Sequence, residues 1–226
     1  MHIADLGARS TVDLVRQRPK AGQVPGLADA HLATAAPLRT SAVPKLNVGR
    51  LALVSLWDDD DAIDRFEADH PAARLLSDGW SVRLDPLRRW GSWPGLPESL
   101  PTDRAAGRDL SDPFVVVTLA RTRMSQLVRF LRTSQQAEAS ATAAPGFVWG
   151  TAVAMPPFFA TVSLWDSVRS LSTYAYGRSD PAHHDAVEVD KAKPFHHESA
   201  FIRFRPYASK GSLGGKNPLS PDWANG

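Results

Sequence analysis

The 226-residue sequence contains no cysteine. The chain therefore has no thiolate nucleophile, no iron–sulfur cluster bound through cysteine and no haem bound through a cysteine thiolate. A lack of cysteine is also typical of proteins from a reducing compartment. Together with the absence of a secretory signal pattern in the first residues, it predicts a cytoplasmic location.

Long apolar runs and blocks of one charge are absent as well. No uninterrupted apolar stretch approaches the roughly 18 residues of a membrane span, so we expect no integral membrane segment. Lys and Arg number 26 against 24 Asp and Glu, for a net charge of +2. There is no basic block and no basic stripe with interleaved aromatics, so we expect no nucleic-acid partner. The overall composition, 43% hydrophobic and 22% charged, is typical of a soluble globular chain.

The pentapeptide Val-Ser-Leu-Trp-Asp occurs twice, at 54–58 and at 162–166. Each copy ends a run of apolar residues that is typical of a strand. Each is followed by apolar residues at helical spacing, with acidic or hydroxyl side chains that suit a helix N-terminus. The repeat therefore predicts the same strand-to-helix junction once in each half of the chain.

The second half has the clearer pattern. It predicts a strand, a helix, two strands joined by a proline turn, a second helix that breaks and restarts, and a last strand, at 113–122, 124–144, 147–155, 158–165, 168–177 and 198–207. The first half predicts the same order less clearly, at 10–17, 27–36, 41–48, 50–57, 58–69 and 80–90, with a helix restart at Pro71. Residues 1–9 are predicted to be loose.

These elements predict an α+β fold of two fused ferredoxin-like βαββαβ units. The units are expected at 10–93 and 113–207, with a linker at 94–112 and a flexible tail at 208–226. Each sheet has one face covered by its own helices, so the other faces can pack together as a dimeric α+β barrel within one chain. Two independent domains are the alternative. The barrel is favoured because both halves break and restart after the second helix.

The two restarts differ at one informative position. Aligning Pro71 with Pro181 places Ala73 opposite His183. A duplicated unit keeps what packing needs, so a change from alanine to histidine indicates a task that one copy alone performs. His183 shares a helix face with apolar Val187 and is expected to point into the fold. A buried histidine bonded to a backbone carbonyl is the structural alternative.

Two other side-chain groups have competing interpretations. His-His-Asp at 183–185 and His-His-Glu at 196–198 each contain the residue types of a two-histidine, one-carboxylate iron site. Adjacent histidines point to opposite faces of a strand, however, which argues against the second group. The four aspartates at 58–61 lack the spacing of a calcium loop and suit a helix N-terminus better.

The chain resembles the spheroidene monooxygenase-like family over about residues 46–207. The resemblance is carried by the two pentapeptide regions at 51–71 and 160–166 and by the Thr-Leu-Ala-Arg-Thr-Arg segment at 118–123. It is also carried by Trp-Gly-x-Trp-x-Gly at 90–95, Pro-Ala-His at 181–183 and the closing Glu-x-x-x-x-Arg-Phe at 198–204. Residues 1–45 fit the family poorly. Because of this difference, one wall of the expected substrate pocket is predicted to differ from that of the family.

The resemblance implies a dimeric α+β barrel, a b-type haem, and oxidation of a hydrophobic small molecule by oxygen or peroxide. It places the iron ligand at His183. Because the chain has no cysteine, histidine is the leading ligand type. Two haem propionates would need cationic partners, for which Arg121 and then Arg203 are the candidates. An electron-donor protein and a homodimer are further partners that the sequence leaves open.

Two other functions remain open at this point. One is a haem enzyme of another class, such as a peroxidase or a dehydratase, because the fold does not fix the reaction. The other is a protein that binds haem or a small molecule without catalysis. The sequence identifies no catalytic residue beyond the proposed iron ligand.

Overall fold

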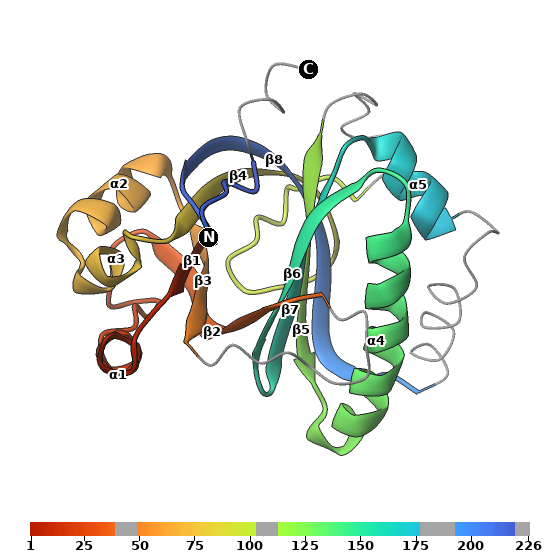
Figure 1. Cartoon of the computed structure of the whole chain (residues 1–226), viewed down its shortest axis with the longest axis horizontal. Helices are drawn as coiled ribbons and strands as arrows, with labels where there is room; N and C mark the ends of the chain where they lie inside the picture. Colours follow the sequence, from red (N-terminus) through yellow and green to blue (C-terminus); the bar gives the residue numbers. More distant parts are fainter. Residues whose placement is uncertain (39–48, 103–112, 177–192, 220–226) are drawn as a thin grey trace.

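Eight antiparallel strands close into a barrel in the order β1-β3-β2-β6-β7-β5-β8-β4 (Figure 1). The computed structural model describes residues 1–38, 49–102, 113–176 and 193–219. The strands span His2–Asp5 (β1), Leu27–Pro37 (β2), Arg50–Trp57 (β3), Trp80–Gly91 (β4), Phe114–Thr122 (β5), Phe147–Met155 (β6), Phe158–Trp165 (β7) and His196–Gly211 (β8).

The barrel wall consists of two halves with the same topology. The first half has the strand order β4-β1-β3-β2, and the second half has the equivalent order β8-β5-β7-β6. Antiparallel pairing of β2 with β6 and of β4 with β8 joins the halves along two edges. The predicted α+β class is therefore confirmed, with two ferredoxin-like sheets forming one barrel within the chain.

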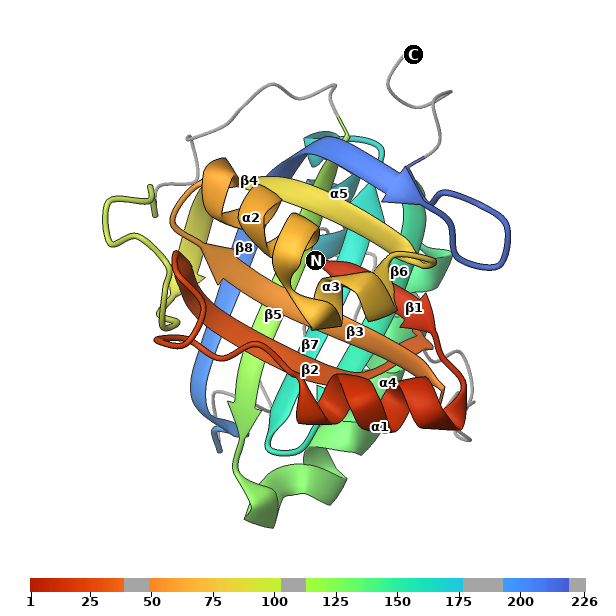
Figure 2. The ribbon, with the colours of Figure 1, turned by 90° about the vertical axis from the view of Figure 1, so that its left-hand side faces the viewer.

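Helices cover the outside of the barrel on both sides (Figures 1 and 2). The helices over the first half are α1 (Ala8–Arg16), α2 (Asp60–Asp69) and α3 (Pro71–Leu76), and those over the second half are α4 (Leu127–Ala143) and α5 (Val168–Tyr176). A short 3-10 turn, η1 (Met124–Gln126), precedes α4. None of the helices in the described ranges is long and apolar enough to cross a bilayer.

The helix starts follow the predicted chemistry. The Asp59 carboxylate caps α2 by accepting the Ala62 N–H at 2.8 Å. His70 Nδ1 accepts the Ala72 N–H at 3.1 Å and caps α3, where Pro71 occupies the first turn. The acidic run at 58–61 thus begins a helix, as its position after the strand predicted.

The first 38 residues differ from the prediction. Residues 10–16 of the predicted strand 10–17 lie in helix α1, whereas 27–36 lies in strand β2 and not in a helix. The N-terminal residues, expected to be loose, form β1. Local propensity suggested a helix for the alanine-rich β2, but pairing with β3 and β6 on its two edges overrides that preference. The first βαββαβ series therefore begins at β1.

The predicted C-terminal tail is more ordered than expected, and the predicted linker lies partly outside the described residues. Strand β8 continues to Gly211, and Leu213 and Leu219 pack against the barrel core, so 208–219 is not a loose tail. Of the predicted linker, Leu96 also packs on this core, while 103–112 lies outside the described residues.

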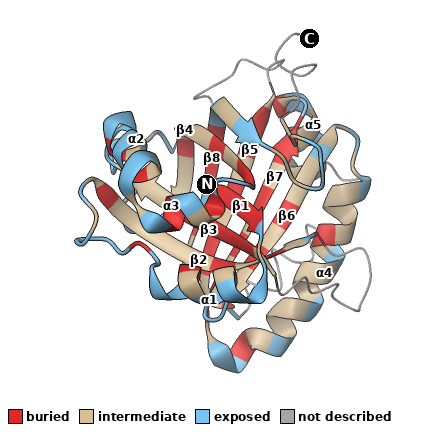
Figure 3. Cartoon of the chain, turned by 60° about the vertical axis from the view of Figure 1, so that its left-hand side comes forward, coloured by how far each residue is buried: buried red, intermediate tan, exposed pale blue. Residues whose placement is uncertain are grey.

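The core has an interior part and two exterior parts (Figure 3). The interior is filled by inward-facing side chains of all eight strands, and the exterior clusters lie under α1–α3 and under α4–α5. The repeated pentapeptide makes the same contact in both halves. The Trp57 indole donates to Ser55 at 2.9 Å, and the Trp165 indole donates to Ser163 at 3.0 Å.

Candidate functional site

A cavity of about 640 Å³ reaches from the barrel interior to the underside of α2. Its inner walls are inward-facing apolar side chains of both halves, namely Val54, Leu56, Val82, Leu84, Leu96, Val117, Leu119, Val162 and Phe204. Its outer rim is polar and includes side chains from the start of α2 and from the outward face of β4. A cavity of this size with apolar walls and a few polar groups suits a small hydrophobic ligand.

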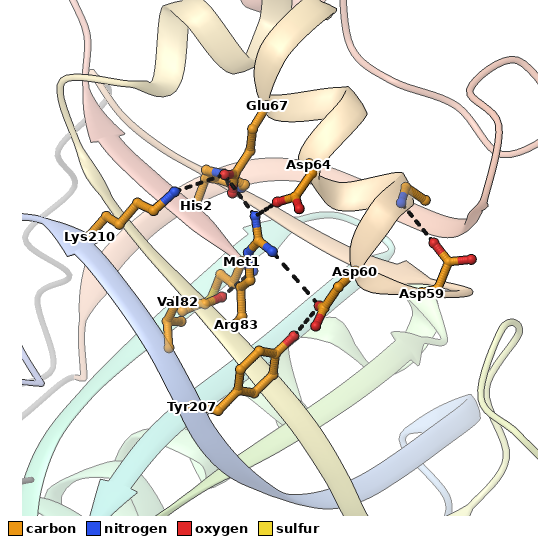
Figure 4. A network of polar contacts seen from close by, with 11 residues as sticks. Met1, His2, Asp59, Asp60, Asp64, Glu67, Val82, Arg83, Tyr207 and Lys210 are labelled. Atoms are coloured by element: carbon orange, nitrogen blue, oxygen red, sulfur yellow. Dashed lines mark hydrogen bonds and ion pairs between the residues drawn. The ribbon is translucent and has the colours of Figure 1, made fainter.

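Arg83 is the central cation of the polar rim (Figure 4). Its guanidinium lies 2.6 Å from Asp64 and 2.9 Å from Glu67, with Asp60 at 3.8 Å. The Tyr207 hydroxyl donates to Asp60, and burial together with this carboxylate raises the pKa of Tyr207 to about 12. These contacts fix α2 over β4 and β8 and so fix the outer opening of the cavity.

His2 and Lys210 complete this network at Glu67. His2 Nε2 lies 3.5 Å from one Glu67 oxygen, and Lys210 Nζ lies 3.3 Å from the other. The hydrogen bond from His2, followed by those from Arg83, lowers the pKa of Glu67 to about 2 despite partial burial. Glu67 is therefore a carboxylate throughout the neutral range.

Stability is expected to fall as the pH drops below 6.5, in part because of His2. Burial lowers the pKa of His2 from 6.5, and this effect outweighs the contact with Glu67. The unfolded chain therefore binds a proton more readily than the folded protein, and stability that is present above pH 6.5 is lost on acidification. Urea unfolding of the wild type and His2→Gln between about pH 7 and pH 5 measures this loss.

The two proteins should differ in the slope of unfolding free energy against pH. The wild type should be steeper by up to about 1.4 kcal/mol per pH unit. Below pH 4.5, protonation of Glu67 adds a second loss that continues to about pH 2. If the wild type and His2→Gln have equal slopes between about pH 5 and pH 7, the pH dependence of stability comes from a group other than His2.

A second group of polar side chains lies inside the barrel, beside the cavity. Asp29 and His31 face inward from β2, where their register partners on β3 are the cavity residues Leu56 and Val54. The Asp29 carboxylate lies 3.0 Å from His31 Nε2 and accepts the Trp93 indole N–H at 2.7 Å. Burial tends to raise the pKa of Asp29, but these two hydrogen bonds, together with the electrostatic effects of His31 and Arg121, lower it.

Arg121 lies in the same interior group. It ends β5 on the inward face, pairs with Glu198 of β8 at 2.6 Å and stacks over the Trp93 ring at 4.8 Å. Arg203, the second candidate partner for a haem propionate, lies on the opposite face of the sheet, over the Phe114 ring at 5.1 Å. The two arginines therefore face different sides of the barrel wall.

The proposed iron ligand His183 lies outside the described residues, as do its neighbours from 177 to 192. The alternative iron site at 196–198 is not supported. His196 contacts the Phe130 ring on the helical side, whereas Glu198 faces the interior pair with Arg121. Within the described ranges, no three His, Asp or Glu side chains are grouped so as to hold a metal ion.

The sequence prediction missed Asp29 and His31 because their segment was assigned to a helix. A weak signal was present in the sequence, since the polar residues Asp29 and His31 alternate with apolar Ala28, Ala30 and Leu32. This period of two places them on one face of a strand. Because the alternating residues are mostly alanine, the pattern has little hydrophobic contrast.

The comparisons with known proteins find sequence similarity to named oxygenases. No protein-family model matches the chain. The spheroidene monooxygenase of Cereibacter sphaeroides is 25% identical over 182 residues, which cover 78% of this chain and 55% of that protein. That of Rubrivivax gelatinosus is 30% identical over 173 residues, covering 74% and 64%. The chain is similar in sequence to the spheroidene monooxygenases.

The chain spans little more than half the length of the Cereibacter protein, at 55%. Among solved structures, an anthrone oxidase-like protein aligns with 95% of this chain and 94% of its own, at 14% identity and a TM-score of 0.37. The expected resemblance to spheroidene monooxygenases is thus confirmed by sequence.

The Trp-Gly-x-Trp-x-Gly segment begins with the last two residues of β4 and carries Trp93 to the interior group. Gly91 has φ 76°, and a Cβ there would lie 2.2 Å from the Ser199 carbonyl oxygen. Gly95 has φ 81°, and a Cβ would lie 2.9 Å from the Ala28 Cβ. Both glycines therefore let the backbone turn and pass closely, which seats Trp93 with only 4% of its surface exposed.

Proposed function

We propose that the protein is a haem-dependent monooxygenase or oxidase that acts on a hydrophobic small molecule bound in the barrel cavity. The observation that carries this proposal is the sequence similarity to spheroidene monooxygenases over about three quarters of the chain. The apolar inner walls of the cavity support the substrate class. A cytoplasmic location, an electron-donor protein and a homodimer stay predictions.

The chain's own residues would bind and orient the substrate. Side chains such as Leu119 and Phe204 would remove apolar substrate surface from water, which is worth roughly 25 cal/mol per Å². The ion pairs of Arg83 keep α2 in place over the opening, so that the walls stay formed without a ligand. Preformed walls lower the ordering cost of binding.

The described residues fit an apolar ligand better than they fit a haem at the same place. His2 is the one imidazole of the cavity lining, and its Nε2 faces Glu67, while its Nδ1 is buried. The described part of the lining therefore offers no imidazole nitrogen that is both unpaired and exposed. A haem would depend on His183, with Arg121 as a propionate partner that must also satisfy Glu198. Bound haem would supply the activation of oxygen or peroxide.

A haem titration of recombinant protein tests this proposal. The wild type should gain a Soret band at one haem per chain. His183→Ala should lose that band or shift it, because the axial nitrogen is gone. His184→Ala is the matched control, since it removes the adjacent imidazole on another face of the predicted helix. An unchanged band and haem content in His183→Ala would reject His183 as the ligand.

Haem chemistry of the peroxidase or dehydratase type is the second candidate. It is favoured by one observation, the hydrogen-bonded Asp29–His31 pair inside the barrel, because such a pair can move protons during peroxide cleavage. Wild-type protein that gains no absorbance with haem would instead favour the third candidate, a non-catalytic protein that binds a small molecule.

A further inference from the structure

The Asp29–His31–Trp93 group is held in one geometry by contacts from three segments of the chain. The His31 ring stacks on Phe158 of β7 with 3.9 Å between centroids and 8° between planes. The Trp93 ring meets the His31 ring edge-on at 5.7 Å. Asp29 holds both rings through one carboxylate oxygen. The imidazole can therefore neither turn nor flip without losing several contacts at once.

This geometry decides which nitrogen of His31 carries a proton. The carboxylate of Asp29 has no proton to donate, so His31 Nε2 must donate to it at 3.0 Å. In neutral His31, Nδ1 then has a free lone pair. Nδ1 has no hydrogen-bond partner among the described residues, and 20% of the side chain surface is exposed. His31 thus presents a hydrogen-bond acceptor at a half-open position.

The acceptor lies beside the apolar cavity. Register partners directly across an antiparallel pair have Cβ atoms about 5 Å apart, and His31 faces Val54 of the cavity wall. On the next segment, Trp93 is followed closely by Gly95 and Leu96, which also line the cavity. The Asp29–His31–Trp93 group therefore lies next to these cavity residues on the inner face of the barrel wall.

The charges of the group favour a neutral polar ligand over an anion. Asp29 and Glu198 are two carboxylates, whereas Arg121 is the one cation among these three and is already paired with Glu198 at 2.6 Å. A carboxylate on the ligand would meet net negative charge. A hydroxyl group avoids this repulsion and can donate to an imidazole nitrogen.

We propose that His31 Nδ1 accepts a hydrogen bond from a hydroxyl group at one end of a ligand whose apolar body fills the cavity. The proposal rests on the proposed binding of a hydrophobic molecule there and narrows its class to hydroxylated molecules. Asp29 and Trp93 are positioning residues, because they set the tautomer and the orientation of the His31 ring.

Binding of naphthol and of its methyl ether tests the proposal. The two probes share an aromatic body, but only naphthol can donate a hydrogen bond. Fluorescence titrations of the 226-residue chain, at matched haem content, give both dissociation constants. The ratio of the ether constant to the naphthol constant should fall by about 3- to 10-fold in His31→Phe, the size expected for one net hydrogen bond. An unchanged ratio would overturn the proposal.

Two further variants separate recognition from folding. Trp93→Phe keeps an aromatic ring but removes the N–H that holds Asp29, and it should lower the ratio to an intermediate value. This variant decides the question if His31→Phe does not fold, because an unchanged ratio would again overturn the proposal. His70→Asn removes an imidazole on α3 while keeping an N-cap acceptor, and its ratio should match the wild type.

The same titrations separate this proposal from the proposed function. If both probes bind the wild type and the ratio does not respond to His31→Phe, the hydroxyl acceptor is wrong while the hydrophobic site stands. If neither probe binds the wild type, the cavity is not a binding site, and both proposals fail.

Discussion

Replacing Trp165 by alanine is expected to lower the free energy of unfolding by about 3–5 kcal/mol, the range for removing a large buried aromatic side chain. Trp165 keeps only 1% of its surface exposed. Its ring meets Phe147 edge-on at 5.6 Å and stacks on Tyr174 at 5.2 Å, and its indole donates to Ser163. It therefore joins β6, β7 and α5, and urea unfolding measures the loss.

Trp57 is the matched control, because it holds the same place in the other copy of the repeat. It donates equivalently to Ser55 but is only half-buried, with Phe66 as its tilted aromatic neighbour at 5.0 Å. Trp57→Ala should therefore cost clearly less than Trp165→Ala. Equal losses would mean that the shared hydrogen bond, and not burial, sets the cost.

Replacing Gly91 by alanine is the second change with a large expected effect, a loss of about 2–4 kcal/mol of unfolding free energy. The residue has φ 76°, a region that L side chains rarely adopt. A Cβ would also lie 2.2 Å from the Ser199 carbonyl oxygen, which belongs to the neighbouring strand backbone and cannot move freely. Thermal and urea unfolding of Gly91→Ala should both report the loss.

Gly22→Ala isolates the backbone part of that effect. Gly22 has φ 79°, but a Cβ there has no heavy atom within 4 Å. The Gly22→Ala change should therefore lower the free energy of unfolding by about 1 kcal/mol, which is the contribution of backbone conformation alone. If Gly91→Ala costs no more than Gly22→Ala, then β4 and β8 tolerate a closer approach than the structure indicates.

The sequence predicted the second half of the fold well because its strands alternate clearly and its helix boundaries carry turn residues. Pro145-Gly146 ends α4, and Asp166 and Ser167 begin α5, as local chemistry requires. The first half was harder because β1 is short and β2 is rich in alanine. Such strands are specified by their neighbours in the barrel and not by their own residues.

For the candidate site, the sequence named Arg121 near a strand end as a partner for a haem propionate, and that role stays a prediction; the structure shows its ion pair with Glu198. It did not identify Asp29 or His31, whose inward direction depends on the strand that local propensity hid. The distinctive glycines were noticed as a motif, but their role needed coordinates. Only the approach of Gly95 to Ala28 explains how Trp93 reaches Asp29.

The two edges at which the halves meet are unequal. Strands β4 and β8 pair along Trp80–Gly91 and Ala200–Gly211, whereas β2 and β6 pair only along Thr34–Pro37 and Thr151–Ala154. Because far fewer interstrand bonds hold the β2–β6 edge, it should open at a lower free-energy cost than the β4–β8 edge. Separation of the two halves is therefore expected to begin at β2 and β6, while the longer pairing of β4 with β8 keeps the halves in register.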